Sequence, residues 1–195
     1  MSAWTEHVAC WKDCTRCPLS QQRSNIVLAR GQVPCDVCII GEAPGVSEDA
    51  LGLPFVGPAG HLLDQIIERA LPPTVRYALT NLVCCFPAEA KARGDNEPEH
   101  GEILACRPRL VEFIKLCRPR LVVLVGALAE QYAHGSDTPE WLPNGSTLKY
   151  CHIVHPAHIL ARLPLAQKQM AVQKCIVVIR SAVEDMLQSM IREIL

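Results

Sequence analysis

The feature that most limits the fold of this chain is the alternation of short apolar segments with longer segments of helical periodicity. Strands are predicted at residues 36–40, 77–83, 121–125 and 148–154. Apolar residues at helical spacing predict helices at residues 4–17, 59–71, 102–116, 127–133 and 165–194. Strands that alternate with helices form parallel sheets covered on both faces. We therefore expect an α/β protein with three layers, α/β/α, around a mostly parallel sheet of four strands.

The length and composition of the chain suit one domain, which we expect to span residues 1–195. Apolar residues make up 49% and charged residues 20%, a balance that supports a real core. The formal net charge is −1, which argues against non-specific nucleic-acid binding through a basic surface, although a local basic patch is compatible with it. The apolar runs are too short to span a bilayer, and the first residues lack a secretory pattern. We expect a soluble, cytoplasmic protein.

Eleven cysteines are many for 195 residues. Because no secretory signal is visible and the number is odd, a disulfide framework is less expected than metal ligation or buried thiols. Cys14 and Cys17 form a C-x-x-C pair that can chelate a metal. Cys85 and Cys106 would complete a set of four thiolates, which suits either zinc or an iron–sulfur cluster.

Two further cysteines leave the ligand set open. Cys84 is adjacent to Cys85, so one of the two is expected to face the site. Cys10 shares a helical face with Cys14 and is an alternative ligand. The remaining cysteines fall in apolar surroundings and are interpreted as core thiols: Cys35, Cys38, Cys117, Cys151 and Cys175.

The segment GEAPGVSEDALGLPFVGPAG, residues 41–60, holds five of the eleven glycines. Its composition predicts a loop rather than the interior of a helix or strand. It lacks the lysine and hydroxyl of a phosphate-binding P-loop, and its glycine spacing does not fit a dinucleotide fingerprint. Polar segments at residues 86–101 and 134–146 predict two more loops.

The carboxyl ends of the predicted strands carry Gly41, Asn81, Gly126 and His155. In open parallel sheets ligands bind at this edge. A lone histidine at a strand end is more often structural than catalytic, but here it shares its edge with the glycine-rich loop. A ligand site is therefore predicted there.

Six motifs, taken together, resemble one family. They are C-x-x-C at residues 14–17, GEAPG-x-x-E-D-x-x-G-x-P-F-V-G-x-A-G-x-L-L at 41–63, T-N-x-V-x-C at 80–85, A-C-R-P at 105–108, a close form of R-P-x-x-V-V-x-L-G at 118–126, and H-P-A-x-I-L at 155–160. This set resembles family 4 of the uracil-DNA glycosylases, the iron–sulfur branch of that superfamily. The resemblance covers essentially the whole chain.

The resemblance implies a monomeric, monofunctional DNA glycosylase that flips uracil out of single- or double-stranded DNA and hydrolyses its N-glycosidic bond, which initiates base excision repair. Phe55 would stack on the flipped base and Asn81 would read its Watson–Crick edge. His155 would donate a hydrogen bond to uracil O2. A 4Fe–4S cluster would be held by four cysteines, with residues 1–24 contributing: Cys14, Cys17, Cys85 and Cys106.

The glycine-rich loop and the last motif would supply the remaining substrate contacts, from Gly41, Ala43 and Arg162. Ala43 stands where other superfamily members carry a water-activating aspartate. Either Glu48 or Glu42 would then position the water, and we favour Glu48.

The resemblance leaves other functions open. One is a catalytically weak or inactive relative that binds uracil-containing DNA or a protein partner. Another is a variant that traps the sugar covalently through His100, although the segment at 86–101 lacks the expected basic run. A third is a zinc-stabilised enzyme of unrelated chemistry.

Overall fold

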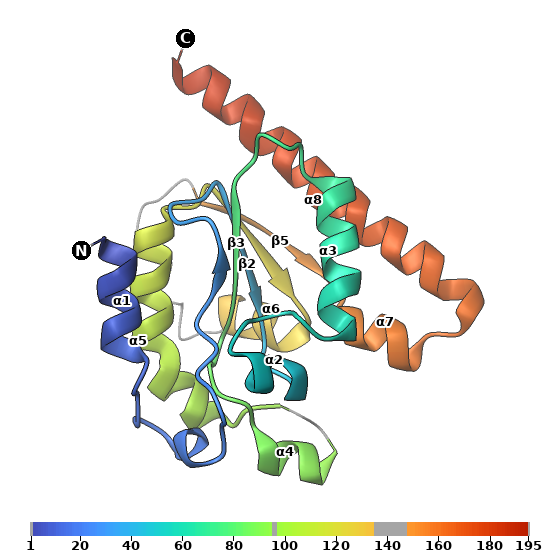
Figure 1. The fold of residues 1–195 in the computed structure, drawn as a ribbon. Helices are drawn as coiled ribbons and strands as arrows, with labels where there is room; N and C mark the ends of the chain where they lie inside the picture. Colours follow the sequence, from blue (N-terminus) through green and yellow to red (C-terminus); the bar gives the residue numbers. More distant parts are fainter. Residues whose placement is uncertain (1, 95–96, 135–147, 195) are drawn as a thin grey trace.

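The computed structural model describes residues 2–94, 97–134 and 148–194 (Figure 1). Within this part of the chain, one sheet has the strand order β1-β3-β2-β4-β5. The strands are β1 (Arg30–Gly31), β2 (Val37–Gly41), β3 (Tyr77–Asn81), β4 (Leu121–Val125) and β5 (Lys149–Ile153). The last four are parallel, which confirms the predicted fold class. The sheet has one strand more than predicted, because β1 is too short to give a periodic signal and pairs antiparallel at the edge.

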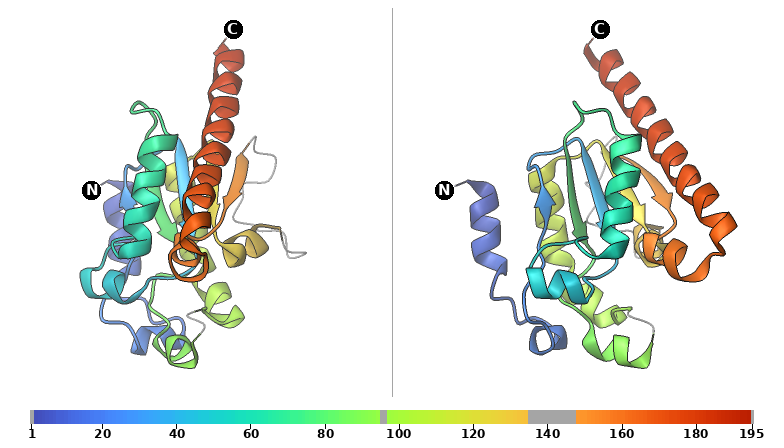
Figure 2. Two further views of the ribbon diagram at one scale, coloured as in Figure 1. Left: turned by 90° about the vertical axis from the view of Figure 1, so that its right-hand side faces the viewer. Right: turned by 45° about the vertical axis from the view of Figure 1, so that its right-hand side comes forward.

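Side chains of the central strands alternate between two cores. Val37 and Ile39 of β2 pack in the same core as helices α3 (Pro58–Ala70) and α8 (Leu165–Ile194). Cys38 and Ile40 pack in the other core, against α5 (His100–Cys117) and α6 (Ala127–His134). Since successive residues of a strand point to opposite faces, a continuous apolar run is what a strand covered on both sides requires. Figure 2 shows α3 and α8 on one side of the sheet and α5 on the other.

Several boundaries differ from the prediction. The first helix, α1 (Ala3–Trp11), ends before Cys14 and Cys17, which lie in the following turn before the short 3₁₀ helix η1 (Pro18–Gln21). Two helices fall in segments predicted as loops, α4 (Ala88–Arg93) and α2 (Val46–Leu51), and α7 (Pro156–Arg162) was not predicted. Most of the predicted loop at 134–146 lies outside the described residues.

Helix α2 corrects the prediction of a helix-free glycine-rich loop. The glycines stand at its ends, since Gly45 is its N-cap and Gly52 ends it with a φ of 70°. The residues between them are compatible with a helix, and a left-handed glycine is a common helix stop. A prediction based on the glycine content of the whole segment therefore missed a helix of six residues.

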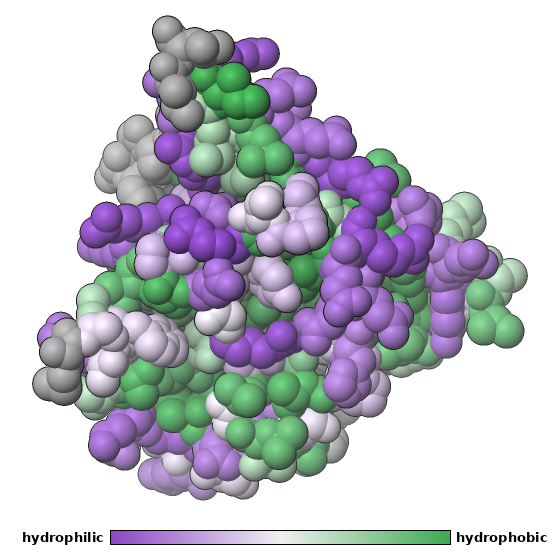
Figure 3. Space-filling model, turned by 45° about the horizontal axis from the view of Figure 1, so that its top comes forward, coloured by the Kyte–Doolittle hydropathy of each residue, from purple (hydrophilic) through white to green (hydrophobic). Residues whose placement is uncertain are grey.

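None of the described helices is both long enough and apolar enough to cross a membrane. The longest, α8, exposes some apolar side chains, including Leu165 at 85% and Met170 at 68%. Figure 3 shows hydrophilic residues interspersed with hydrophobic ones over one face of the molecule. Exposed apolar residues of this kind are common at protein surfaces.

Candidate active site

A pocket of about 610 Å³ opens at the carboxyl edge of the parallel strands. Its walls come from the glycine-rich loop and from the segments that follow β2, β3, β4 and β5. Most of the side chains predicted for catalysis or substrate binding line it: Glu42, Ala43, Glu48, Phe55, Asn81 and His155. The exceptions are Gly41, which adjoins Phe55 and Asn81, and Arg162, which ends α7, is exposed and does not line the pocket.

Gly41, the last residue of β2, brings two of these side chains together. A Cβ atom at this position would lie 2.5 Å from Cζ of Phe55 and 2.6 Å from Oδ1 of Asn81. The strand register explains the approach, because Gly41 pairs directly with Asn81. Only glycine therefore lets an aromatic ring and an amide both approach the end of β2.

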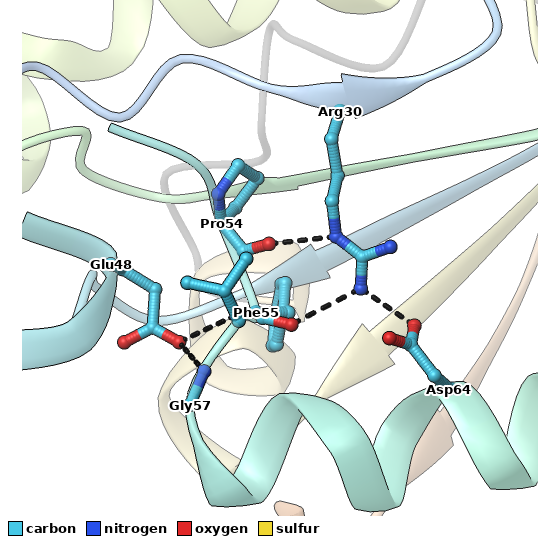
Figure 4. A network of polar contacts seen from close by, with 7 residues as sticks. Arg30, Glu48, Pro54, Phe55, Gly57 and Asp64 are labelled. Carbon is cyan, nitrogen blue, oxygen red and sulfur yellow. Dashed lines mark hydrogen bonds and ion pairs between the residues drawn. The ribbon is translucent and has the colours of Figure 1, made fainter. Parts of the chain in front are cut away.

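Glu48, in α2, braces the glycine-rich loop. Its Oε1 accepts hydrogen bonds from the backbone N–H groups of Val56, at 2.8 Å, and Gly57, at 2.7 Å. Its Oε2 accepts one from the N–H of Gly45, at 3.0 Å, so it reaches back to the N-cap of its own helix. Figure 4 shows the carboxylate directed at the backbone beside Phe55. Both carboxylate oxygens of Glu48 thus accept hydrogen bonds from the backbone of the glycine-rich loop.

Glu42 is bound more weakly than Glu48. Its Oε1 accepts one long hydrogen bond, 3.4 Å, from the N–H of Leu128. Both Glu42 and His155 border Gly126, where a Cβ atom would collide with the carboxylate and lie 3.2 Å from Cδ2 of His155. Burial raises the pKa of Glu42, because desolvation disfavours the charged form.

His155 is held as a neutral imidazole of defined orientation. Its Nδ1 accepts a hydrogen bond from the N–H of Ala157 at 3.1 Å, in the first turn of α7. The ring proton then resides on Nε2, which becomes a donor. Burial lowers the pKa of His155 to about 4, against the opposing effect of the Glu48 charge, and His158 lowers it further. His155 is therefore uncharged at neutral pH.

Other pocket residues were not predicted as site residues. Phe86 and Glu97 line the pocket from the segment after β3. No local pattern identified them, since their position depends on how that segment folds back. His152 and His158 also line the pocket, and His152 pairs with Glu130 at 3.3 Å.

A second, narrow cavity lies between α1, the start of α5 and the segment after β3. All four predicted ligands line it together with a fifth thiol: Cys14, Cys17, Cys84, Cys85 and Cys106. Cys10, the other alternative ligand, is exposed and does not line it. No group of three or more Cys, His, Asp or Glu side chains among the described residues is arranged around a single metal ion. Four cysteine thiolates are a donor set that either zinc or an iron–sulfur cluster accepts.

The two adjacent cysteines occupy different surroundings. Cys84 packs with Trp11 and Leu28, and its Sγ lies 3.6 Å from Sγ of Cys106. Sγ of Cys85 instead accepts a hydrogen bond from the Arg23 guanidinium at 3.1 Å. Burial raises the pKa of Cys85 to about 11. A thiol in direct contact with another ligand leaves little room for a cluster between them, which favours Cys85 over Cys84.

Arg109 of α5 connects the two cavities and was not predicted. Its side chain is 1% exposed. The guanidinium donates to Oγ1 of Thr80 at 2.7 Å and to the carbonyl oxygens of Asn81 at 2.6 Å and Leu82 at 3.0 Å. It also lies 3.8 Å from Sγ of Cys106. An arginine beside Leu110 and Phe113 on the buried face of a helix was the signal that could have identified it.

Comparison with known proteins agrees with this geometry. The family model of the uracil DNA glycosylase superfamily matches residues 29–176. A "Type-4 uracil-DNA glycosylase" of Pyrobaculum aerophilum is 37% identical over 118 residues, which cover 60% of this chain and 58% of that protein. The protein of the same name from Saccharolobus solfataricus is 38% identical over 122 residues, covering 62% and 54%.

A third relative is similar over more of its length. The "Type-4 uracil-DNA glycosylase" of Archaeoglobus fulgidus is 28% identical over 171 residues, covering 80% of this chain and 82% of that protein. The first two matches span only a little over half of the relatives' length. Because the family model covers most of the sequence, the chain belongs to the uracil DNA glycosylase superfamily.

Proposed function

We propose that this protein is a DNA glycosylase that hydrolyses the N-glycosidic bond of uracil in DNA. The observation that carries the proposal is the convergence of Phe55, Asn81, Glu42 and His155 on one pocket at the carboxyl edge of the sheet. Membership of the superfamily and the names of the relatives support it. The substrate lies within a duplex or strand, so the nucleotide must be flipped out to reach the pocket.

Base recognition follows from the pair of side chains beside Gly41. The Phe55 ring offers a flat apolar surface on which a flipped base recovers part of its lost stacking. The Asn81 amide has one acceptor and one donor, which match N3–H and O4 of uracil. Cytosine presents the opposite pattern at these positions, so an amide held in the orientation that suits uracil would leave the groups of cytosine unpaired.

His155 acts on the leaving group. Cleavage of the bond between C1′ and N1 leaves the electron pair on uracil, and negative charge develops on O2. The neutral Nε2–H donor then strengthens its hydrogen bond as the charge grows, which stabilises the transition state more than the ground state. The hydrogen bond from Ala157 to Nδ1 fixes the tautomer that this step needs.

We assign the orientation of the attacking water to Glu42 rather than Glu48. The hydrogen bonds of Glu48 hold the loop backbone, whereas Glu42 has one long contact and, like His155, borders Gly126. The oxygen of the water bonds to C1′ as uracil departs, and a proton of the water passes to the Glu42 carboxylate. Its raised pKa suits it to accept that proton.

The cysteine cavity has a separate role in this proposal. Cys14, Cys17, Cys85 and Cys106 would hold a 4Fe–4S cluster, which when bound would tie the N-terminal segment to α5 and to the segment after β3. No step of the reaction passes through this cavity, since the reacting groups lie in the other one. Arg23 and Arg109 place positive charge beside the thiolates.

The direct test uses purified protein and oligonucleotides that contain a single uracil, hypoxanthine or xanthine, in single- and double-stranded form. We expect release of uracil and strand cleavage after alkali. Tight binding of uracil-containing DNA without base release would instead identify a non-catalytic relative. Inactivity on the whole panel, with the protein folded and its iron content measured, would overturn the proposal.

A further inference from the structure

Phe55 has a backbone conformation that its side chain disfavours. Its φ is 57°, in the left-handed region that glycine adopts easily and a bulky residue does not. The side chain is nevertheless buried against Gly41 and is only 6% exposed. Such a conformation persists only where its surroundings fix it, and it is found preferentially at ligand-binding sites.

The carbonyl groups of the two peptides that flank Phe55 are fixed by Arg30 of β1. Its Nε donates a hydrogen bond to the carbonyl oxygen of Pro54 at 2.7 Å, and one terminal nitrogen donates to that of Phe55 at 3.2 Å (Figure 4). The same nitrogen forms an ion pair with Oδ1 of Asp64 in α3, at 2.6 Å. A guanidinium is a rigid planar fork, so it fixes both peptide groups at once.

The N–H groups that follow Phe55 are fixed by the opposite charge. Glu48 accepts the N–H groups of Val56 and Gly57, the two residues after Phe55. Gly60 leaves the room needed, because a Cβ atom there would overlap the Phe55 carbonyl group. Arg30 therefore holds the carbonyl groups of both peptides that flank Phe55, and Glu48 holds the N–H of the second of them and of the peptide that follows.

We propose that Arg30, oriented by Asp64, is a positioning residue that sets the Phe55 ring as the platform for the flipped base. The inference rests on the proposed function and assigns a role to the short edge strand. Strand β1 places Arg30 opposite Leu79 of β3, from where the guanidinium reaches the glycine-rich loop. Without the fork, the peptide between Pro54 and Phe55 is free to turn, and the ring loses its position beside Gly41.

The test compares Arg30→Met, Arg30→Lys and Asp64→Asn with a matched control, Arg76→Met. Arg76 also forms an ion pair with an aspartate, Asp36, but at the opposite end of the sheet. We expect Arg30→Met to lower kcat/KM for uracil-DNA by roughly 10- to 100-fold, mostly through KM, and to weaken inhibition by free uracil. Arg30→Lys should retain a higher kcat/KM than Arg30→Met, and Asp64→Asn should lower kcat/KM less than Arg30→Met does. Arg76→Met should have the kcat/KM of the wild type.

A double-mutant cycle with Phe55→Ala separates this role from a general effect on folding. If Arg30 acts through the ring, Arg30→Met should cost almost nothing in the Phe55→Ala background. Additive losses in an active enzyme would overturn the inference while leaving the proposed function intact. If the wild type releases no base, crystal structures decide, and a Phe55 φ still near its wild-type value in Arg30→Met would overturn the inference. If Arg30→Met does not fold, Arg30→Lys and Asp64→Asn replace it in the same double-mutant cycle with Phe55→Ala.

Discussion

The pocket and the cysteine cavity lie on either side of the end of β3, but they are built in different ways. In the pocket, backbone hydrogen bonds hold Glu48 and His155, and a glycine makes room for Phe55 and Asn81. In the cavity, buried and partly buried cysteines line a narrow space, and two of their thiols are in direct contact. The pocket is thus preorganised by the polypeptide, whereas in the cavity the proposed cluster would separate and fix the side chains.

The largest expected effect is that of His155→Ala, which should impair the pocket and leave the cysteine cavity unchanged. We predict that His155→Ala lowers kcat for uracil release by roughly 100- to 1000-fold, because the developing charge on O2 loses its donor. The iron content should stay unchanged, since this residue does not line the cysteine cavity. Single-turnover kinetics and iron analysis check both parts. His158→Ala, on the same helix, is the control and should keep most of the rate.

The second prediction concerns the adjacent cysteines. Cys85→Ala should abolish the brown colour of a bound cluster and lower the melting temperature, whereas Cys84→Ala should keep the iron. The reason is that Cys84 packs with apolar side chains and contacts another proposed ligand directly. Visible absorbance and iron analysis on anaerobically purified protein measure the outcome. Iron retained in Cys85→Ala but lost in Cys84→Ala would reverse the assignment.

A smaller effect is expected from Gly41→Ala. The added methyl group would meet both the Phe55 ring and the Asn81 amide, so one of them must move. We predict a loss of roughly tenfold in kcat/KM, with a weaker preference for uracil over cytosine, because each displaced contact contributes on the order of 1–2 kcal/mol. Gly101→Ala is the control, since a Cβ atom there meets nothing within 4 Å.

The smallest effect is in the pH dependence. Glu42 must be ionised to take a proton from water, and burial raises its pKa. Activity should therefore fall as the pH drops through this raised value, while His155, with a pKa of about 4, is still neutral. The profile of kcat/KM against pH tests this, and Glu42→Gln should remove the acidic inflection. An inflection that persists in this variant would assign it to another group.

The comparison also explains which parts could be predicted from the sequence. The central strands were predictable because each is a continuous apolar run, and the side chains at their carboxyl ends followed from the rule for parallel sheets. Helix α2 and strand β1 were missed because six and two residues give too short a pattern.

The roles of two arginines, Arg109 and Arg30, were also not predicted from the sequence. Arg109 and Arg30 act through backbone carbonyl groups of segments distant in the sequence, so no motif contains both partners. The positive φ of Phe55 was equally hidden, because phenylalanine does not signal a left-handed conformation as glycine does.

The positions of the cysteines have a further consequence for the unfolded chain. Close to half of the sequence, including the entire glycine-rich loop, lies between Cys14 and Cys106. A group bound to both would close that segment into a ring and restrict the unfolded ensemble, an entropic effect on the order of 4–5 kcal/mol for a loop of this length. A group bound in the cavity would then stabilise the folded pocket mainly by reducing the number of conformations open to the unfolded chain.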